Sequence, residues 1–170
     1  MIYIVSGEID RGKTQKIESL YRQREQGGGF VSRKIFEGTA LRGYEIVDLT
    51  TGRRLPLALK TEVLPDNWDE ACRCGPFSFS LKAIAMAEKI VDGIIADSVE
   101  PVFIDEVGPL ELRGRGFALL LKRVLDTDKE IYLTVRRTCL TPIVRSFNIR
   151  NYELIELEKS DAKKNSIHSK

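Results

Sequence analysis

The sequence has few of the residues that staple small proteins or bind zinc. It contains three cysteines and one histidine among 170 residues. Three is an odd number for a disulfide framework, and free thiols fit a reducing compartment. Cys72 and Cys74 could build a four-ligand site only with Cys139 and His168, and that spacing matches no zinc motif. We therefore predict unpaired thiols rather than a disulfide or zinc scaffold.

The sequence also lacks long apolar runs and a strong net charge. No run approaches the roughly 18 residues that a membrane span requires. The apolar segment at 2–5 follows no basic region of the kind that opens a signal peptide. These features predict a cytoplasmic protein without a membrane partner. Lys and Arg total 27 against 25 Asp and Glu, a net charge of +2, so no nucleic-acid partner is expected.

The remaining composition is that of an ordinary globular protein. Apolar residues make up 42% and charged residues 31% of the chain. A length of 170 residues is enough for one domain that buries its own core. We predict a single domain over residues 1–158 and a polar, disordered tail over 159–170.

Apolar segments of strand type alternate with helical patterns along the chain. Strands are expected at 1–5, 101–107, 130–135 and 152–157, and helices at 14–26, 78–96, 116–125 and 141–147. The triplet at 27–29 is three glycines, which are typical of a helix end. This alternation predicts an α/β protein with three αβα layers and a mostly parallel central sheet.

The segment that follows the first predicted helix has a different pattern. Short β-type stretches at 30–36, 41–49 and 55–60 are separated by turn residues. They predict an antiparallel, β-rich insert at about 30–60. Residues 61–76 are rich in Pro, Asp, Asn and Gly and are expected to form a long loop, which in a compact domain is usually functional or mobile.

A phosphate-binding motif directly follows the first predicted strand. Residues 7–14 match G-x-x-x-x-G-K-[ST] between a strand and a helix, which predicts a P-loop NTPase fold. Its glycines allow backbone N–H groups to converge on phosphate at the positive end of the helix. Lys13 is expected to bind the β- and γ-phosphates, and the Thr14 hydroxyl to bind Mg²⁺. The predicted nucleotide-binding residues are Gly7, Glu8, Ile9, Asp10, Arg11, Gly12, Lys13, Thr14 and Gln15.

Two residues of this motif are unusual. Asp10 stands where another glycine is common, and Gln15 stands where a second Ser or Thr is common. Asp tolerates a left-handed backbone better than most residues, so the loop can still form. Its carboxylate would lie close to phosphate charge, which Arg11 offsets only in part. We therefore expect Asp10 to weaken nucleotide affinity.

Two acidic residues end the apolar strand expected at 101–107. In a parallel sheet, ligands bind beyond the carboxyl ends of the strands, so Asp105 and Glu106 should emerge beside the phosphate motif. Asp105 is expected to hold Mg²⁺, as a Walker-B aspartate does. Glu106 is expected to take a proton from an attacking water, and its presence favours hydrolysis over simple binding.

Charge that develops on the transferred phosphoryl group also requires a further cation. Arg136 is the first choice, because it directly follows the apolar strand expected at 130–135. The other candidates are Arg33, Arg113, Arg115 and Arg137. The predicted catalytic residues are thus Lys13, Glu106 and Arg136.

Three stretches together resemble a known family. Residues 7–14, Gly-Phe-Val-Ser-Arg at 29–33, and Ile-Asp-Glu-Val-Gly-Pro-Leu-Glu-Leu at 104–112 occur in that order. They are similar to the small nucleoside-triphosphatases related to the cancer-related nucleoside triphosphatase and its thermophile relatives. The resemblance covers roughly 1–158, and 104–112 is its most specific part. It implies an αβα P-loop fold and slow magnesium-dependent hydrolysis of several nucleoside triphosphates to diphosphate and phosphate. It also implies the roles described above for Lys13, Thr14, Asp105 and Glu106.

The same motif leaves two other functions open. A kinase for a nucleotide or another small molecule needs an acceptor pocket and a lid, which residues 61–76 with Trp68 could supply. A nucleotide-dependent switch would bind triphosphate in order to regulate a partner. The choice between ATP and GTP cannot be made from the sequence, which contains no N-K-x-D guanine signature.

Overall fold

The computed structural model describes residues 1–157, so the predicted tail lies outside the described residues and the division into one domain and a tail stays a prediction. The strands are β1 (Ile2–Gly7), β2 (Gly28–Glu37), β3 (Ala40–Asp48), β4 (Arg54–Lys60), β5 (Glu70–Cys74), β6 (Phe77–Ser80), β7 (Val102–Val107), β8 (Ile131–Arg136) and β9 (Tyr152–Glu156). The helices are α1 (Lys13–Arg24), α2 (Leu81–Ala96), α3 (Pro109–Leu112), α4 (Ala118–Leu125) and α5 (Leu140–Ser146). Short 3-10 turns lie at Thr61–Val63 and Arg137–Cys139.

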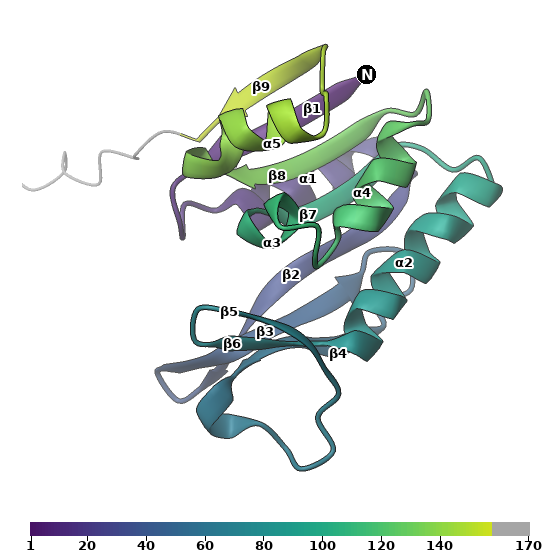
Figure 1. The fold of residues 1–170 in the computed structure, drawn as a ribbon. Coiled ribbons are helices and arrows are strands. Elements are labelled where there is room, and N and C mark those ends of the chain that lie inside the picture. Colours follow the sequence, from purple (N-terminus) through teal and green to yellow (C-terminus); the bar gives the residue numbers. More distant parts are fainter. Residues whose placement is uncertain (158–170) are drawn as a thin grey trace, which may run out of the picture.

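The strands form one sheet with a parallel and an antiparallel half. Their order within residues 1–157 is β5-β6-β4-β3-β2-β7-β8-β1-β9. From β2 to β9 all neighbours are parallel. From β2 to β5 all neighbours are antiparallel, and Figure 1 shows this half below the parallel half. The α/β architecture with a β-rich antiparallel insert after the first helix is as predicted.

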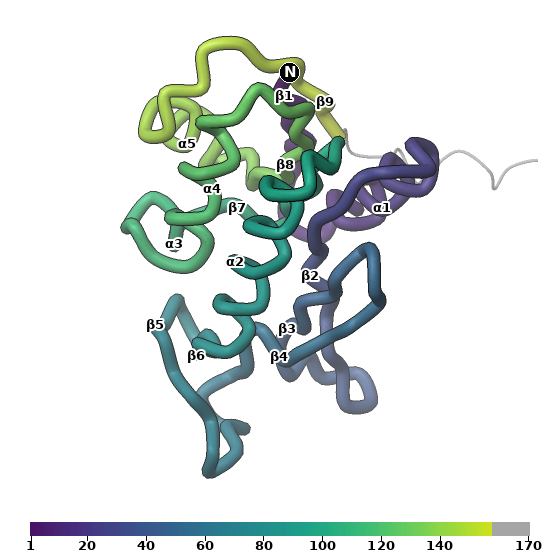
Figure 2. Tube along the Cα trace, turned by 90° about the vertical axis from the view of Figure 1, so that its right-hand side faces the viewer, coloured from purple at the N-terminus to yellow at the C-terminus, as the bar shows by residue number. Residues whose placement is uncertain are grey.

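Helices cover both faces of the parallel half. Figure 2 shows α1 on one face, and α2, α3, α4 and α5 on the other. Because side chains alternate along a strand, Phe103 of β7 packs with Ile17 of α1, whereas Ile104 joins the larger core beneath α2, α4 and α5. A strand covered on both faces must be apolar throughout, which explains the continuous apolar run before Asp105.

The hairpin of β5 and β6 corrects the expectation of a loop at 61–76. Its two strands pair in antiparallel fashion, and the turn between them contains Gly75 with a φ of 56°. Gly75 and Pro76 are therefore the turn of a hairpin and not part of an irregular loop. The hairpin also extends the antiparallel insert to Ser80, beyond the predicted limit of about residue 60.

Several helix boundaries also differ from the sequence expectations. α2 begins at Leu81, later than the expected residue 78, because Ser80 caps it: the Ser80 hydroxyl accepts a hydrogen bond from the Ala83 N–H at 3.2 Å. α3 was not expected at all, and α1 ends at Arg24.

Gly29 belongs to β2, where its φ is 140° and a Cβ atom would lie 1.9 Å from the Phe103 carbonyl oxygen, so the β2–β7 contact requires glycine. None of the described helices is both long and apolar enough to cross a membrane.

Candidate active site

The phosphate motif forms the loop between β1 and α1. Asp10 and Gly12 have φ angles of 60° and 78°, in the left-handed region that glycine enters freely and aspartate tolerates. The loop turns there so that α1 starts at Lys13. The first N–H groups of a helix have no acceptor within the helix, and the helix dipole makes that end positive. The loop is therefore built to bind an anion.

Lys13 folds back over this loop. Its side chain is 8% exposed, and its Nζ atom donates hydrogen bonds to the Gly7 carbonyl at 3.2 Å and the Glu8 carbonyl at 2.7 Å. Within residues 1–157 no carboxylate forms a salt bridge with it. The ammonium charge at the centre of the loop is thus free to attract an anionic ligand.

Asp105 is fully buried at the end of β7. Its Oδ2 atom accepts hydrogen bonds from the Thr14 hydroxyl at 2.7 Å and from the Ser32 N–H at 3.0 Å, and its Oδ1 atom accepts one from the Thr134 hydroxyl. Burial raises the pKa of Asp105, and these hydrogen bonds act in the opposite direction. The structure thus brings Thr14 and Asp105 together, with β2 and β8 supplying the other donors.

Glu106 departs from the regular strand. Its φ is 67°, and the register between β7 and β8 shifts between Ile104 and Val107. The Glu106 N–H donates to the Thr134 hydroxyl at 2.7 Å. Such a bulge redirects a side chain, so the bulge rather than the strand pleat sends the Glu106 carboxylate into the cavity described below.

The environment of Glu106 raises its pKa to about 7. The Glu106 side chain is exposed to the cavity, yet the protein atoms around its carboxylate remove part of its water, and this desolvation is the largest cause. The negative charge of Asp105 adds to the rise, whereas the charges of Lys13 and Arg136 lower the pKa. A carboxyl group with this pKa is partly ionised at neutral pH and can accept a proton.

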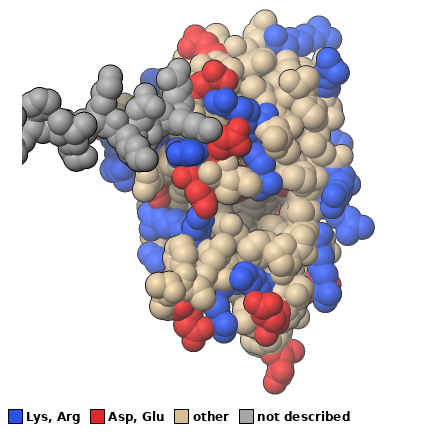
Figure 3. Space-filling view, turned by 90° about the vertical axis from the view of Figure 1, so that its left-hand side faces the viewer, with Lys and Arg blue, Asp and Glu red and all other residues tan. Residues whose placement is uncertain are grey.

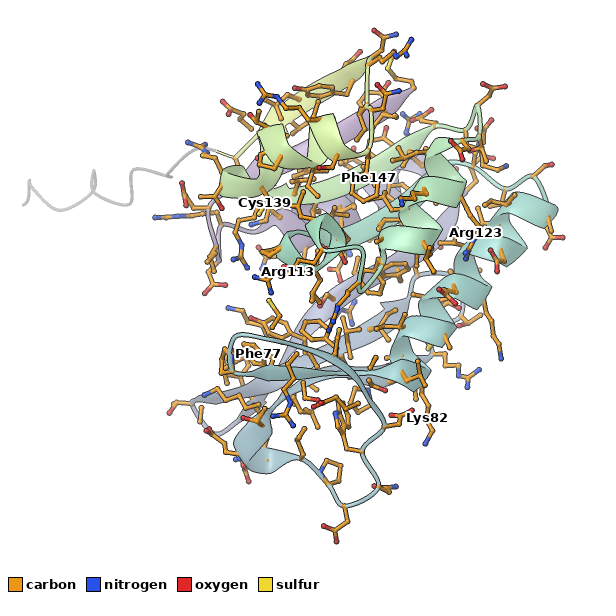
Figure 4. The ribbon with its side chains drawn as sticks, in the orientation of Figure 1. Phe77, Lys82, Arg113, Arg123, Cys139 and Phe147 are labelled. Atoms are coloured by element: carbon orange, nitrogen blue, oxygen red, sulfur yellow. The ribbon has the colours of Figure 1, made fainter. Side chains whose placement is uncertain are left out.

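A cavity of about 700 Å³ connects these side chains, a size typical of small-molecule sites. Residues 9–15 of the phosphate loop line one end. The antiparallel half of the sheet and α2 line the other end, through Tyr44, Leu57, Phe77, Phe79 and Ile84. Figure 3 shows the hollow near the middle of one face of the molecule. In Figure 4, Phe77 of the β5–β6 hairpin lies across from Arg113, which follows α3.

The five candidate arginines occupy different places. Arg33 and Arg136 line the cavity, and Arg113, Arg115 and Arg137 do not. Arg33 is paired with Glu18 at 2.8 Å, and Arg137 lies 4.0 Å from Glu8. Arg136 has no salt bridge within the described part of the chain, and its charge reaches Glu106. Among the five candidates, Arg136 is thus the one that lines the cavity without a salt bridge to a carboxylate of residues 1–157.

The structure adds neighbours that the sequence analysis missed. Lys34 of β2 binds the Asp10 carboxylate at 2.5 Å between Nζ and Oδ1, and it lines the cavity. No local pattern in the sequence marks Lys34. The sequence does mark Thr134, because it is a polar residue within the apolar strand β8. The structure buries it fully.

Glu111, also missed, holds the segment after β7. Its side chain is 5% exposed and accepts hydrogen bonds from the N–H groups of Gly108 at 2.8 Å and Phe117 at 2.9 Å. Gly116 approaches the same carboxylate, since a Cβ atom there would lie 2.5 Å from the Glu111 Oε1 atom. A buried carboxylate therefore fixes this wall of the cavity.

The donor set fits magnesium better than a metal that needs an all-protein cage. Within residues 1–157, no group of three or more His, Cys, Asp or Glu side chains is arranged around a common point. Magnesium is usually held by one or two carboxylates together with phosphate oxygens and water. Asp105 and the Thr14 hydroxyl beside the phosphate loop match that requirement.

Comparison with known proteins agrees with this geometry. A family model described as NTPase matches residues 2–169. The nucleoside-triphosphatase THEP1 of Thermotoga maritima is 26% identical over 168 residues, which cover 98% of this chain and 91% of that protein. The nucleoside-triphosphatase THEP1 of Methanothermobacter thermautotrophicus is 29% identical over 169 residues, with coverages of 95% and 90%.

Two similar solved structures share the fold. The crystal structure of THEP1 from the hyperthermophile Aquifex aeolicus has a TM-score of 0.75 at 20% identity and covers 95% of this chain and 92% of its own. The solution structure of a human cancer-related nucleoside triphosphatase has a TM-score of 0.67 at 20% identity, with coverages of 94% and 89%. Since the family model matches nearly the whole chain, the protein belongs to the NTPase family and is an enzyme of the nucleoside-triphosphatase class.

Proposed function

We propose that this protein hydrolyses ATP- or GTP-type nucleoside triphosphates to diphosphate and phosphate, with Mg²⁺ as cofactor. The observation that carries the proposal is the hydrogen bond between the buried Asp105 and Thr14, which lines the cavity together with Lys13 and Glu106. The relatives named nucleoside-triphosphatase support the substrate class. The three free cysteines support a cytoplasmic location, where thiols stay reduced.

The phosphate loop holds the triphosphate. The N–H groups of the loop and of the first turn of α1 bind its oxygens, and Lys13 exchanges the carbonyls of Gly7 and Glu8 for phosphate oxygens. Thr14 and Asp105 would hold Mg²⁺ beside it. A bound Mg²⁺ would neutralise negative charge on the triphosphate.

Glu106 acts as the general base. It accepts a proton from a water whose oxygen attacks the γ-phosphorus, while the bond from that phosphorus to the bridging oxygen breaks and its electron pair leaves with the diphosphate. Arg136, which lines the same cavity, stabilises the negative charge that develops on the γ-phosphoryl oxygens.

The first experiment measures phosphate release from a panel of triphosphates with Mg²⁺ by the wild type and by Glu106→Ala. Loss of the base should lower turnover by about a hundredfold or more. Nucleotide binding, measured in parallel, should persist. Glu153→Ala is the matched control, because Glu153 is exposed on β9 and does not line the cavity. Equal phosphate release by wild type and Glu106→Ala would refute the proposed base.

A further inference from the structure

The cavity extends beyond what hydrolysis of a triphosphate requires. We name its apolar part the apolar arm, which is lined by Tyr44, Leu57, Phe77, Phe79, Ile84 and Phe117. These residues come from β3, β4, β6, α2 and the N-cap of α4. A water molecule and a polyphosphate gain nothing from such walls, whereas an apolar body buried there gains about 25 cal/mol per Å² of surface removed from water.

The arm adjoins the catalytic carboxylate. Tyr44 of the arm and Glu106 line the same cavity. Burial raises the pKa of the Tyr44 hydroxyl, and the negative charge of Glu106 adds to that rise. In phosphoryl transfer the attacking and leaving oxygens are roughly in line through the phosphorus. Because Glu106 is the proposed base, the attacking oxygen lies on the Glu106 side of the γ-phosphorus. The diphosphate and the nucleoside then lie on the opposite side, and the arm faces the attacking group.

The hairpin wall of the arm is held rigidly. The Trp68 indole N–H donates to the Ser78 hydroxyl at 2.8 Å, and that hydroxyl donates to Glu70, which also accepts from Arg73 at 2.7 Å. These bonds connect the segment around Trp68 to the hairpin, so the hairpin side of the arm is already formed without a ligand. When a pocket is already formed, ligand binding does not have to order its side chains, and the binding free energy is more favourable.

The edge of the Phe77 ring also has an aromatic partner. Its centroid lies 5.3 Å from that of Tyr44, with an angle of 67° between the ring planes. This edge-on contact joins the hairpin to β3 across the arm. A flat apolar molecule in the arm would therefore contact aromatic rings and lie beside the Glu106 carboxylate.

We propose that the apolar arm is a second substrate site, which holds a small alcohol with an aromatic body and presents its hydroxyl to Glu106 as a phosphoryl acceptor. This inference rests on the proposed orientation of the triphosphate. The alcohol oxygen forms a bond to the γ-phosphorus, and the bond from that phosphorus to the β–γ bridging oxygen breaks with its electron pair going to the diphosphate. The hydroxyl proton goes to Glu106. Water takes the same place when the arm is empty, and hydrolysis results.

The test is a partition experiment with γ-³²P-labelled ATP and Mg²⁺. Equal concentrations of 2-phenylethanol or ethanol are added, and labelled phosphate ester is separated from labelled phosphate. The ratio of ester to phosphate should be about tenfold or more higher with 2-phenylethanol, because its ring occupies an apolar pocket. The ratio should also saturate with concentration. Normal phosphate release with equal ratios for both alcohols would overturn the inference and leave the proposed hydrolysis intact.

Variants of residues that line the apolar arm provide a second test. Ile84→Trp fills the arm from α2, and Leu81→Trp adds the same ring to the same helix at a position that is 57% exposed and outside the cavity. Ile84→Trp should lower the ester-to-phosphate ratio by about tenfold. Phosphate release without alcohol should stay near the wild-type rate. Leu81→Trp should change neither quantity.

Phe77→Ala gives an independent readout, since it removes a partly buried aromatic ring of the arm at the turn of the hairpin. It should raise the concentration of 2-phenylethanol needed for half-maximal ester formation, again with phosphate release near the wild-type rate. If Ile84→Trp does not fold, this variant decides alone. An unchanged half-maximal concentration would refute the apolar arm as the acceptor site. Ester formed by a protein that releases no phosphate from water would refute the hydrolysis and support the acceptor site.

Discussion

The hydroxyl of Thr14 donates a 2.7 Å hydrogen bond to Asp105, a residue 91 positions away in the sequence. The same carboxylate also receives the Ser32 N–H and the Thr134 hydroxyl. Donors from three elements, α1, β2 and β8, therefore hold this buried carboxylate of β7 in place before any ligand binds. A carboxylate fixed in this way avoids reorganisation when the proposed magnesium site fills.

Replacing Asp105 with Asn should weaken magnesium binding. Asn keeps the size of the side chain but removes the charge that would attract the ion. We expect the Mg²⁺ concentration for half-maximal phosphate release to rise by about tenfold or more. Asp66→Asn is the control, because Asp66 is exposed. An unchanged Mg²⁺ requirement in Asp105→Asn would show that the ion is held elsewhere.

The pH dependence of hydrolysis should report Glu106. Its pKa is raised to about 7, so the carboxyl group is mostly protonated below pH 7 and cannot accept a proton there. The value of kcat/KM should therefore rise as the pH increases through about 7 and level off above it. The same profile in Glu106→Gln, at its lower rate, should lack this transition. A transition that persists in Glu106→Gln would assign it to another group.

The ion pair between Asp10 and Lys34 should set part of the nucleotide affinity. Asp10→Gly should tighten binding, because it removes a negative charge from the phosphate loop. Lys34→Ala should loosen binding, because it leaves Asp10 without its partner at 2.5 Å. Each effect should be about two- to fivefold, the scale of exposed ion pairs. Calorimetry of the two single variants and the double variant gives their coupling, and a dissociation constant that stays equal or rises in Asp10→Gly would contradict the role of Asp10.

Gly116→Ala should destabilise the protein more than Gly114→Ala. Both glycines have positive φ angles, 58° and 70°, so both substitutions carry a similar backbone cost. At Gly116 the new Cβ atom would also lie 2.5 Å from the Glu111 carboxylate, whereas nothing lies within 4 Å at Gly114. We expect the free energy of unfolding to fall by about 1 kcal/mol for Gly114→Ala and by about 2–3 kcal/mol for Gly116→Ala. Equal losses in urea unfolding would show that the Glu111 contact yields without cost.

The sequence predicts those parts of the site that are encoded locally. The phosphate loop is contiguous, and the end of an apolar strand marks Asp105 and Glu106. Lys34 and Tyr44 could not be predicted, because they reach the cavity only through the pairing of β2 with β3, where they lie opposite each other. No local pattern states that register.

The β5–β6 hairpin was missed for a different physical reason. Its strands are short, and β5 is largely exposed, so it lacks the apolar run that marks a buried strand. What stabilises the hairpin is pairing with β4 and side-chain hydrogen bonds such as that of Trp68 to Ser78. The direction of Glu106 was equally hidden, because a bulge depends on the neighbouring strand.

The bulge at Glu106 lowers the stability of the fold, whereas the proposed hydrolysis requires the Glu106 carboxylate. A side chain other than glycine at a φ of 67° costs free energy, and its carboxylate lies beside the negative charge of Asp105. Glycine at that position would relieve both costs. A library of variants selected only for resistance to heat should therefore enrich glycine at position 106 and lose phosphate release. Selection for turnover should retain glutamate there despite its cost to stability.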